Sequence, residues 1–166
     1  TFSNIVHLDI SGIKFEGGND NVVNLRNITQ FDFTNVEASK SGLQNGISCN
    51  DSNGTFTSCK AFHNRNDGFN FHGFGDTHLI DCEGHYNFDD GNSHHDGCTG
   101  TVIRGEWSHN GKGGCSPTYG SIVHLDSVYS HHNRYGLYCD GNSDNPKRTV
   151  RHSNCVLKDN TGADYL

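Results

Sequence analysis

The most reactive side chains of this sequence gather near its middle, in the stretch that runs from Asp89-Asp90 to His94-His95-Asp96. Carboxyl groups and imidazoles commonly transfer protons in catalysis, and a pair of them can supply the acid and the base that cleave a glycosidic bond. The same groups also bind metals, because imidazole with carboxylate suits a transition ion and carboxylate oxygens suit calcium. Asp-Asp-Gly and His-Asp-Gly are also common turn sequences, so a purely structural role is a third alternative.

The backbone that carries these residues is indicated by a repeat of 23 residues. Its apolar, small and Asn positions recur in four successive sets, Phe56, Cys59, Ala61, Asn64; Leu79, Cys82, Gly84, Asn87; Val102, Gly105, Trp107, Asn110; and Leu125, Val128, Ser130, Asn133. The apolar part extends back through Phe33 and Ile10 and, after an insertion of four residues, forward to Cys155. Self-similarity at a fixed period predicts a solenoid in which each repeat is one stacked coil.

Short strands, rather than helices, are expected within each coil. Residues 68–73 and 136–141 are runs bounded by Gly in which apolar and polar side chains alternate, as is typical of strands. The sequence therefore predicts an all-β, single-stranded parallel β-helix of about seven coils, right-handed because parallel crossover connections prefer that hand. One inward column is expected to contain Ile13, Val36, Cys59, Cys82, Gly105 and Val128.

Alternation along the strands orients the reactive residues. If Phe69 and Phe71 point into the core, His72 points outward, and a shift of one repeat places His94 inward and His95 outward. The same shift from His95 leads to Thr118, and a shift of 22 residues, because the next coil is one residue shorter, leads to Asp140. These positions predict one exposed column made of His72, His95, Thr118 and Asp140, with Asp96 and Tyr119 at its edge. We expect catalytic roles for His95, Asp96, Asp90 and His72, and substrate contacts from Asp89, Thr118, Tyr119, Tyr138 and Asp140.

Composition and charge exclude some classes of partner and disfavour one type of reaction. The formal charge of −7 argues against nucleic acid, which requires a basic face, and no apolar run is long enough to span a membrane. Arg65, Arg104 and Arg134 are scattered over different columns, which favours hydrolysis or binding over lyase action on polyuronates. Seven cysteines cannot all pair, and the equivalent positions of Cys59 and Cys82 predict reduced thiols buried in the core.

The chain is expected to form a single β-helix domain over residues 1–166. Solenoids shield their terminal coils with polar caps, and no capping sequence is recognisable here. We therefore expect the sequence to be a fragment of a longer chain whose coils continue beyond one or both ends.

These coils resemble the right-handed parallel β-helix of the pectate-lyase-like superfamily, which includes pectate and alginate lyases, polysaccharide hydrolases, alginate C5-epimerases and bacteriophage tailspikes. Residues 67–72 and 89–97 also resemble β-helix domains of phage tail proteins. The epimerases carry Asp-Pro-His on the strand that matches Asn92-Ser93-His94, and only the His is retained. The resemblance implies an extracellular protein, secreted or on the cell surface, or a virion tail, and the altered motif argues against epimerase activity.

Two functions follow from these observations. The first is a module that binds or cleaves a polysaccharide or cell-surface glycan along the exposed column, as a hydrolase or lyase if it is an enzyme. The alternative is a structural and receptor-binding segment of a homotrimeric phage tail spike or fibre without catalysis. A transition metal bound by His72, His95 and Asp96 or Asp140 is a further alternative at the same column, and calcium bound by the Asp-rich turns is another.

Overall fold

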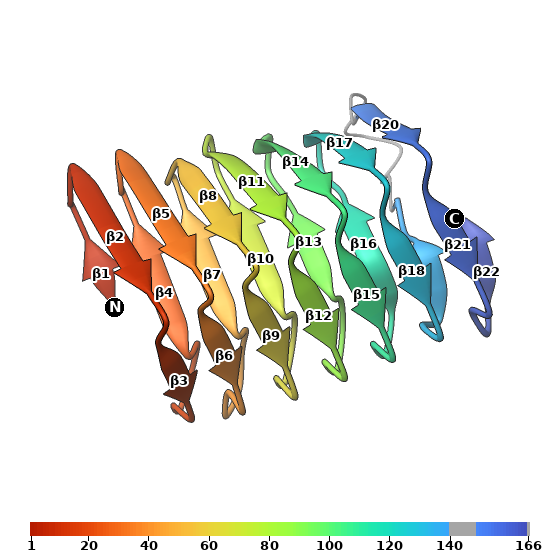
Figure 1. Ribbon diagram of the computed structural model, residues 1–166, viewed down its shortest axis with the longest axis horizontal. Helices are drawn as coiled ribbons and strands as arrows, with labels where there is room; N and C mark the ends of the chain where they lie inside the picture. Colours follow the sequence, from red (N-terminus) through yellow and green to blue (C-terminus); the bar gives the residue numbers. More distant parts are fainter. Residues whose placement is uncertain (140–148, 166) are drawn as a thin grey trace.

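The computed structural model describes residues 1–139 and 149–165, in which all regular structure is β-strand. The strands form three parallel sheets, and each strand pairs with its equivalents one coil before and one coil after it. Figure 1 shows the coils stacked in a row, with the two termini at opposite ends of the stack. The predicted all-β parallel β-helix, with about seven coils of 23 residues, is confirmed.

The first sheet, called sheet A below, has eight strands: β1 (Phe2–Ser3), β4 (Val23–Arg26), β7 (Ile47–Asn50), β10 (Phe69–His72), β13 (Asn92–His94), β16 (Gly113–Pro117), β19 (Tyr135–Leu137) and β22 (Ala163–Tyr165). Sheet B has seven: β2 (His7–Ser11), β5 (Gln30–Thr34), β8 (Gly54–Thr57), β11 (Asp76–Ile80), β14 (Thr99–Ile103), β17 (Ile122–Asp126) and β20 (Thr149–Ser153). Sheet C also has seven: β3 (Lys14–Glu16), β6 (Glu37–Ser39), β9 (Lys60–Phe62), β12 (Glu83–His85), β15 (Glu106–Ser108), β18 (Tyr129–His131) and β21 (Val156–Lys158).

The pairing register follows the sequence repeat. In sheet A, Phe69 pairs with Asn92 and Phe71 with His94, each 23 residues on. Equivalent side chains therefore stack along the axis at about 4.8 Å, the usual spacing of neighbouring strands. Phenylalanine rings fill the core in this way: Phe31, Phe33 and Phe56 have ring centroids 4.8–5.7 Å apart and are fully buried.

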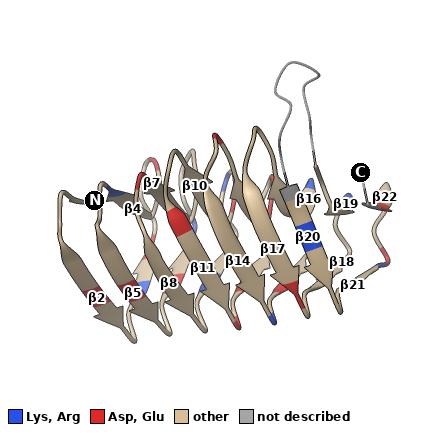
Figure 2. Cartoon of the chain, turned by 90° about the horizontal axis from the view of Figure 1, so that it is seen from above, with Lys and Arg blue, Asp and Glu red and all other residues tan. Residues whose placement is uncertain are grey.

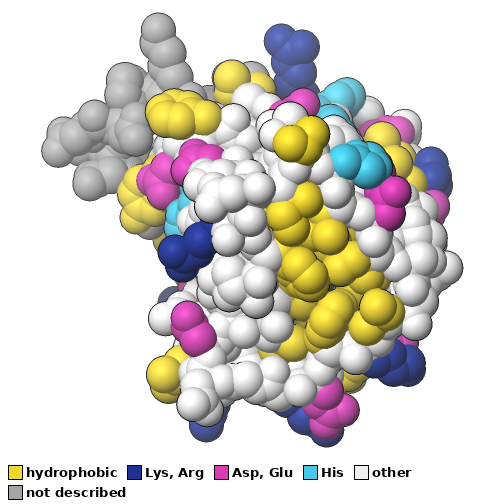
Figure 3. All heavy atoms as spheres, turned by 90° about the vertical axis from the view of Figure 1, so that its left-hand side faces the viewer, with side chains coloured by type: hydrophobic (Ala, Val, Ile, Leu, Met, Phe, Trp, Pro, Cys, Tyr) yellow, Lys and Arg dark blue, Asp and Glu magenta, His cyan; other side chains and the backbone are white. Residues whose placement is uncertain are grey.

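The predicted inward column is buried except at its first member. Val36, Cys59, Cys82, Gly105 and Val128 are buried, whereas Ile13 in the first coil is 43% exposed. Ile13 lies at the end of the stack, where no preceding coil covers it. Figure 3 shows the apolar side chains that gather on this end, and Phe2, Leu8, Ile10 and Phe15 are partly buried against the core there.

A ladder of asparagines supports the turn between sheets C and A. The side-chain amide of Asn64 donates to Asn87, Asn87 to Asn110, and Asn110 to Asn133, at 2.9–3.0 Å. These hydrogen bonds give the column a structural role in the turn. The left-handed backbone conformation of this turn lies one residue before each Asn, at His63, Tyr86, His109 and His132, with φ of 55–57°.

None of the seven cysteines forms a disulfide in the part of the chain that the structure describes, and all except Cys155 are buried, as predicted. Charged residues are spread along the chain: among the described residues, Figure 2 shows acidic and basic positions interspersed over strands and turns. Within residues 1–139 and 149–165, the structure contains no helix with the length and hydropathy needed to cross a membrane.

Candidate functional site

The predicted column forms on the side of sheet A that faces away from the core. The imidazole rings of His72 and His95 stack with centroids 4.8 Å apart, and Nδ1 of His95 lies 2.7 Å from the hydroxyl of Thr118. At the edge, Asp96 accepts from Nδ1 of His72 at 3.0 Å, and the ring of Tyr119 lies 6.0 Å from that of His95. The structure therefore brings five of the predicted site residues together.

The column is less exposed than the sequence indicated. Thr118 points outward but is only 3% exposed, and the outward-facing Asn70, Ser93 and Ser116 are also buried. Ser93 is enclosed because Asp67 binds its hydroxyl at 2.6 Å and His95 lies 3.0 Å away on the other side. The expectation that Thr118 is exposed was therefore wrong, because neighbouring side chains enclose it.

His95 is held in one tautomer by these contacts. Ser93 donates its hydroxyl proton to Oδ2 of Asp67, so its oxygen accepts from Nε2–H of His95. Nδ1 of His95 is then the acceptor, and it receives the hydroxyl proton of Thr118. Burial, with the neighbouring His72, lowers the pKa of His95 to about 4, so the ring is neutral at physiological pH. His95 is better suited to orienting its neighbours than to exchanging protons with a substrate.

Three carboxyl groups meet beside the column. Asp67, Asp89 and Asp90 each offer an oxygen within 4.8 Å of the others, and Lys112 reaches Asp89 and Asp90 at 3.7 and 3.8 Å. Asp67 accepts at both oxygens, from Asn70 and Ser93 at one and from the Asp90 amide at the other, and burial raises its pKa. Lys112 also lies 4.5 Å from the ring centre of Tyr138, which places Tyr138 at the border of the site.

The cluster carries a buried proton. Asp90 is 2% exposed, and burial, followed by the charges of Asp67 and Asp89, raises its pKa to about 8. Burial also raises the pKa of Asp89, whose side chain is 34% exposed. Asp89 is therefore the carboxyl group of the cluster that a bound ligand can touch, while Asp90 lies beneath it.

Four of the remaining predicted residues lie at the surface, and one lies outside the part of the chain that the structure describes. His72 and Asp96 have exposed side chains, and Tyr119 and Tyr138 also reach the surface. Asp140 lies outside the described residues. Sequence reasoning missed Asp67, Ser93 and Lys112, although Asp67 and Asp90 occupy equivalent positions 23 residues apart, as do Asp89 and Lys112. That repeat was the signal that could have identified them.

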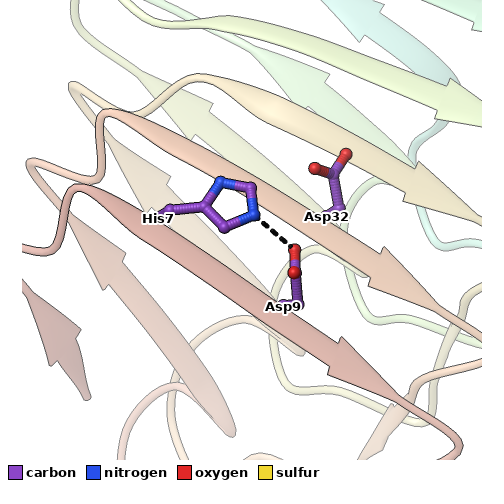
Figure 4. A group of neighbouring side chains, drawn as sticks. All are labelled: His7, Asp9 and Asp32. Atoms are coloured by element: carbon purple, nitrogen blue, oxygen red, sulfur yellow. Dashed lines mark ion pairs between the residues drawn. The ribbon is translucent and has the colours of Figure 1, made fainter.

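The hydrogen bonds of His95 limit which side chains of the column can bind a metal ion. Both ring nitrogens of His95 face hydroxyl groups, so His72 and His95 do not present a pair of free nitrogens to a transition ion. Another group of described residues with suitable atoms is His7, Asp9 and Asp32, where Nε2 of His7 bonds to Asp9 at 3.0 Å (Figure 4). Exposed groups of this kind are common on proteins without a metal.

Comparison with known proteins finds a similarity in fold to a solved structure and no similarity in sequence. No protein-family model matches the chain, and no curated protein matches its sequence. Among solved structures, it is similar to the periplasmic alginate epimerase AlgG, with a TM-score of 0.63 and 10% identity over 95% of this chain. The match covers 41% of the epimerase, so the chain spans less than half of that protein. At this identity the similarity shows a shared β-helix fold.

Proposed function

We propose that this chain engages a polysaccharide along the outward side of sheet A, across β10, β13 and β16. The observation that carries the proposal is the placement of three accessible ionisable side chains, those of His72, Asp96 and Asp89, on a buried network that fixes them. A row of parallel strands offers an extended, regular surface, which suits a linear polymer. The likeness in fold to an alginate epimerase supports the same broad class of ligand.

We propose acid–base cleavage as the chemistry of this surface. Asp89 is the candidate acid, because it is accessible and burial raises its pKa, so that it can protonate the leaving oxygen of a glycosidic bond. His72 is the candidate base, since Asp96 binds its Nδ1 and so directs Nε2 as the nitrogen for a substrate or water. His95 and Asp90 are positioning residues, which hold Ser93, Thr118 and the carboxyl cluster in place.

Epimerase chemistry is not part of the proposal. The stretch that aligns with the epimerase motif is Asn92-Ser93-His94, and its one retained residue is enclosed. His94 is fully buried, and its ring lies 4.6 Å from that of Phe71 in the core. A substrate on the outward side of sheet A cannot touch it.

The test uses His72→Gln and Asp89→Asn against a panel of neutral and acidic polysaccharides, with release of reducing ends as the assay for cleavage. Removing a general acid or base is expected to lower the rate by about 10²–10⁴-fold. His124→Gln is the matched control, because His124 is an exposed imidazole on sheet B. The proposal fails if no glycan is bound or cleaved, or if both site variants act on it as the parent does.

A further inference from the structure

A second concave surface follows the turns from sheet C to sheet A, at the lower edge of Figure 1 after β9, β12, β15 and β18. It consists of two adjoining hollows of about 700 and 660 Å³, here called the ring groove, which share Tyr86, His109, Gly111 and Arg134. The first hollow reaches Asp89 and Lys112 but is not lined by His72 or His95. The ring groove therefore meets the proposed polysaccharide surface at Asp89 and extends away from it along the turns, without His72 or His95.

One wall of the ring groove is a ladder of stacked rings. His63, Tyr86, His109 and His132 lie on four successive coils, with centroid separations of 5.2, 4.7 and 5.0 Å and interplanar angles of 19°, 22° and 3°. All four residues are exposed. Because each ring covers the face of the next, the ladder presents ring edges, with their N–H and O–H groups, to solvent.

The turn itself does not require rings at this position. The four ring residues have φ of 55–57°, a conformation that is unfavourable for bulky side chains. The equivalent residues of other coils have the same left-handed backbone without a ring: Gly17, Lys40 and Asp159. The rings thus occur only on the four coils that carry the ring groove, and backbone geometry does not explain them.

Fixed positive charge also lines the ring groove. Arg65 and Arg134 are exposed and line it at equivalent positions three coils apart, about 14 Å at the usual strand spacing, so the expectation that these two arginines lie in different columns was wrong. Neither guanidinium forms an ion pair with another described residue, although the chain has a formal charge of −7. The one carboxylate among the described lining residues is Asp89, which already pairs with Lys112.

We infer that the ring groove binds an anionic polysaccharide, a linear chain that carries carboxylate or sulfate groups. Two guanidiniums spaced along the axis suit repeated anionic groups, which arginine binds through paired hydrogen bonds. The polar ring edges suit sugar hydroxyls. A single-stranded nucleic acid would need several open ring faces on which to stack its bases, and in the ladder each face between neighbours is covered, which leaves Phe88, among the described lining residues, as the exposed ring outside the ladder. This inference does not depend on the function proposed for sheet A.

The test is titration of the full chain with polygalacturonate, with dextran as the neutral polymer, for the parent and for Arg65→Gln and Arg134→Gln. Each substitution removes charge-assisted hydrogen bonds and is expected to weaken polygalacturonate binding about tenfold. Arg104→Gln is the matched control, since Arg104 is an exposed arginine on the turn between sheets B and C, where it pairs with Asp81. We expect Arg104→Gln to bind as the parent does and dextran not to compete, and His72→Gln is titrated in parallel to report any binding on sheet A.

Each contrary outcome overturns the inference and is distinct from a failure on sheet A. Polygalacturonate that does not bind, or that binds the Arg65→Gln and Arg134→Gln variants as tightly as the parent, excludes an anion site in the ring groove. If polygalacturonate binding is lost in the His72→Gln variant and retained in the two arginine variants, the polymer binds sheet A and not the ring groove. Competition by oligothymidylate as strong as that by polygalacturonate would identify a nucleic-acid surface. Loss of cleavage in His72→Gln with retained polygalacturonate binding supports both sites.

Discussion

The buried proton of Asp90 should give the protein a distinctive dependence of stability on pH. The pKa of Asp90 is about 8 in the folded chain against 3.8 when exposed, so between these values the folded state holds a proton that the unfolded state has lost. The free energy of unfolding should therefore fall by about 1.4 kcal/mol per pH unit as the pH rises towards 8. Asp90→Asn removes this contribution while its side-chain oxygen can still accept from the Gly113 amide.

Two buried imidazoles make the free energy of unfolding rise with pH over a lower pH range. The folded pKa is about 3 for His94 and about 4 for His95, below the 6.5 of an exposed imidazole, so the unfolded state takes up two protons as the pH falls below 6.5. Stability from these groups is present above pH 6.5 and is lost by about 2.7 kcal/mol per pH unit below it. Together with Asp90, they predict a maximum of stability near pH 6.5.

Urea unfolding monitored by the fluorescence of Trp107, the single and fully buried tryptophan, measures this profile. The parent should lose stability between about pH 6.5 and pH 8, and Asp90→Asn should show a plateau there. Asp20→Asn, at an exposed aspartate, should retain the profile of the parent. A parent whose stability is constant or increasing over this range, or an Asp90→Asn variant with an unchanged slope, would refute the buried proton.

Other predictions concern the core and the ladder. Asn110→Ala removes four side-chain hydrogen bonds within the ladder and should lower the free energy of unfolding by about 3 kcal/mol in urea, whereas an unchanged midpoint would contradict a structural role. His94→Ala opens a cavity beside Phe71 and should cost about 2–4 kcal/mol, while His94→Leu should cost less, as thermal unfolding can show. Thiol titration should find seven free thiols in denaturant and slow labelling of six in the native protein, and any disulfide found by mass spectrometry would count against this.

Much of the fold could be predicted because its determinants are local and repeated. The 23-residue spacing from Cys59 to Cys82 predicts which residues of neighbouring coils stack on each other. The alternation of apolar and polar residues around Phe69 and Phe71 predicts which side chains of the strand point into the core. Both were confirmed, as was the inward position of His94. The exposure of Ile13 was not predicted, because the pattern of a repeat does not say whether another coil covers it.

The candidate site was predicted only in part. The column of His72, His95 and Thr118 follows from the register alone, and it is present. The burial of Thr118 and the carboxyl cluster around Asp90 depend on how turn residues fold over the outward side of sheet A. Strand alternation contains no information on that packing, so the network through Asp67 became visible only in three dimensions.

The most direct test of glycan engagement by sheet A is to record the imidazole resonances of the protein by NMR while candidate oligosaccharides are added. The account predicts that a bound oligosaccharide shifts the signals of His72 and His95, because they lie on the proposed surface, and leaves that of His124 on sheet B unchanged. A bound oligosaccharide that shifts only other imidazoles, or a broad panel in which none binds, would contradict it. The second result would favour the structural tail segment that the sequence left as the alternative.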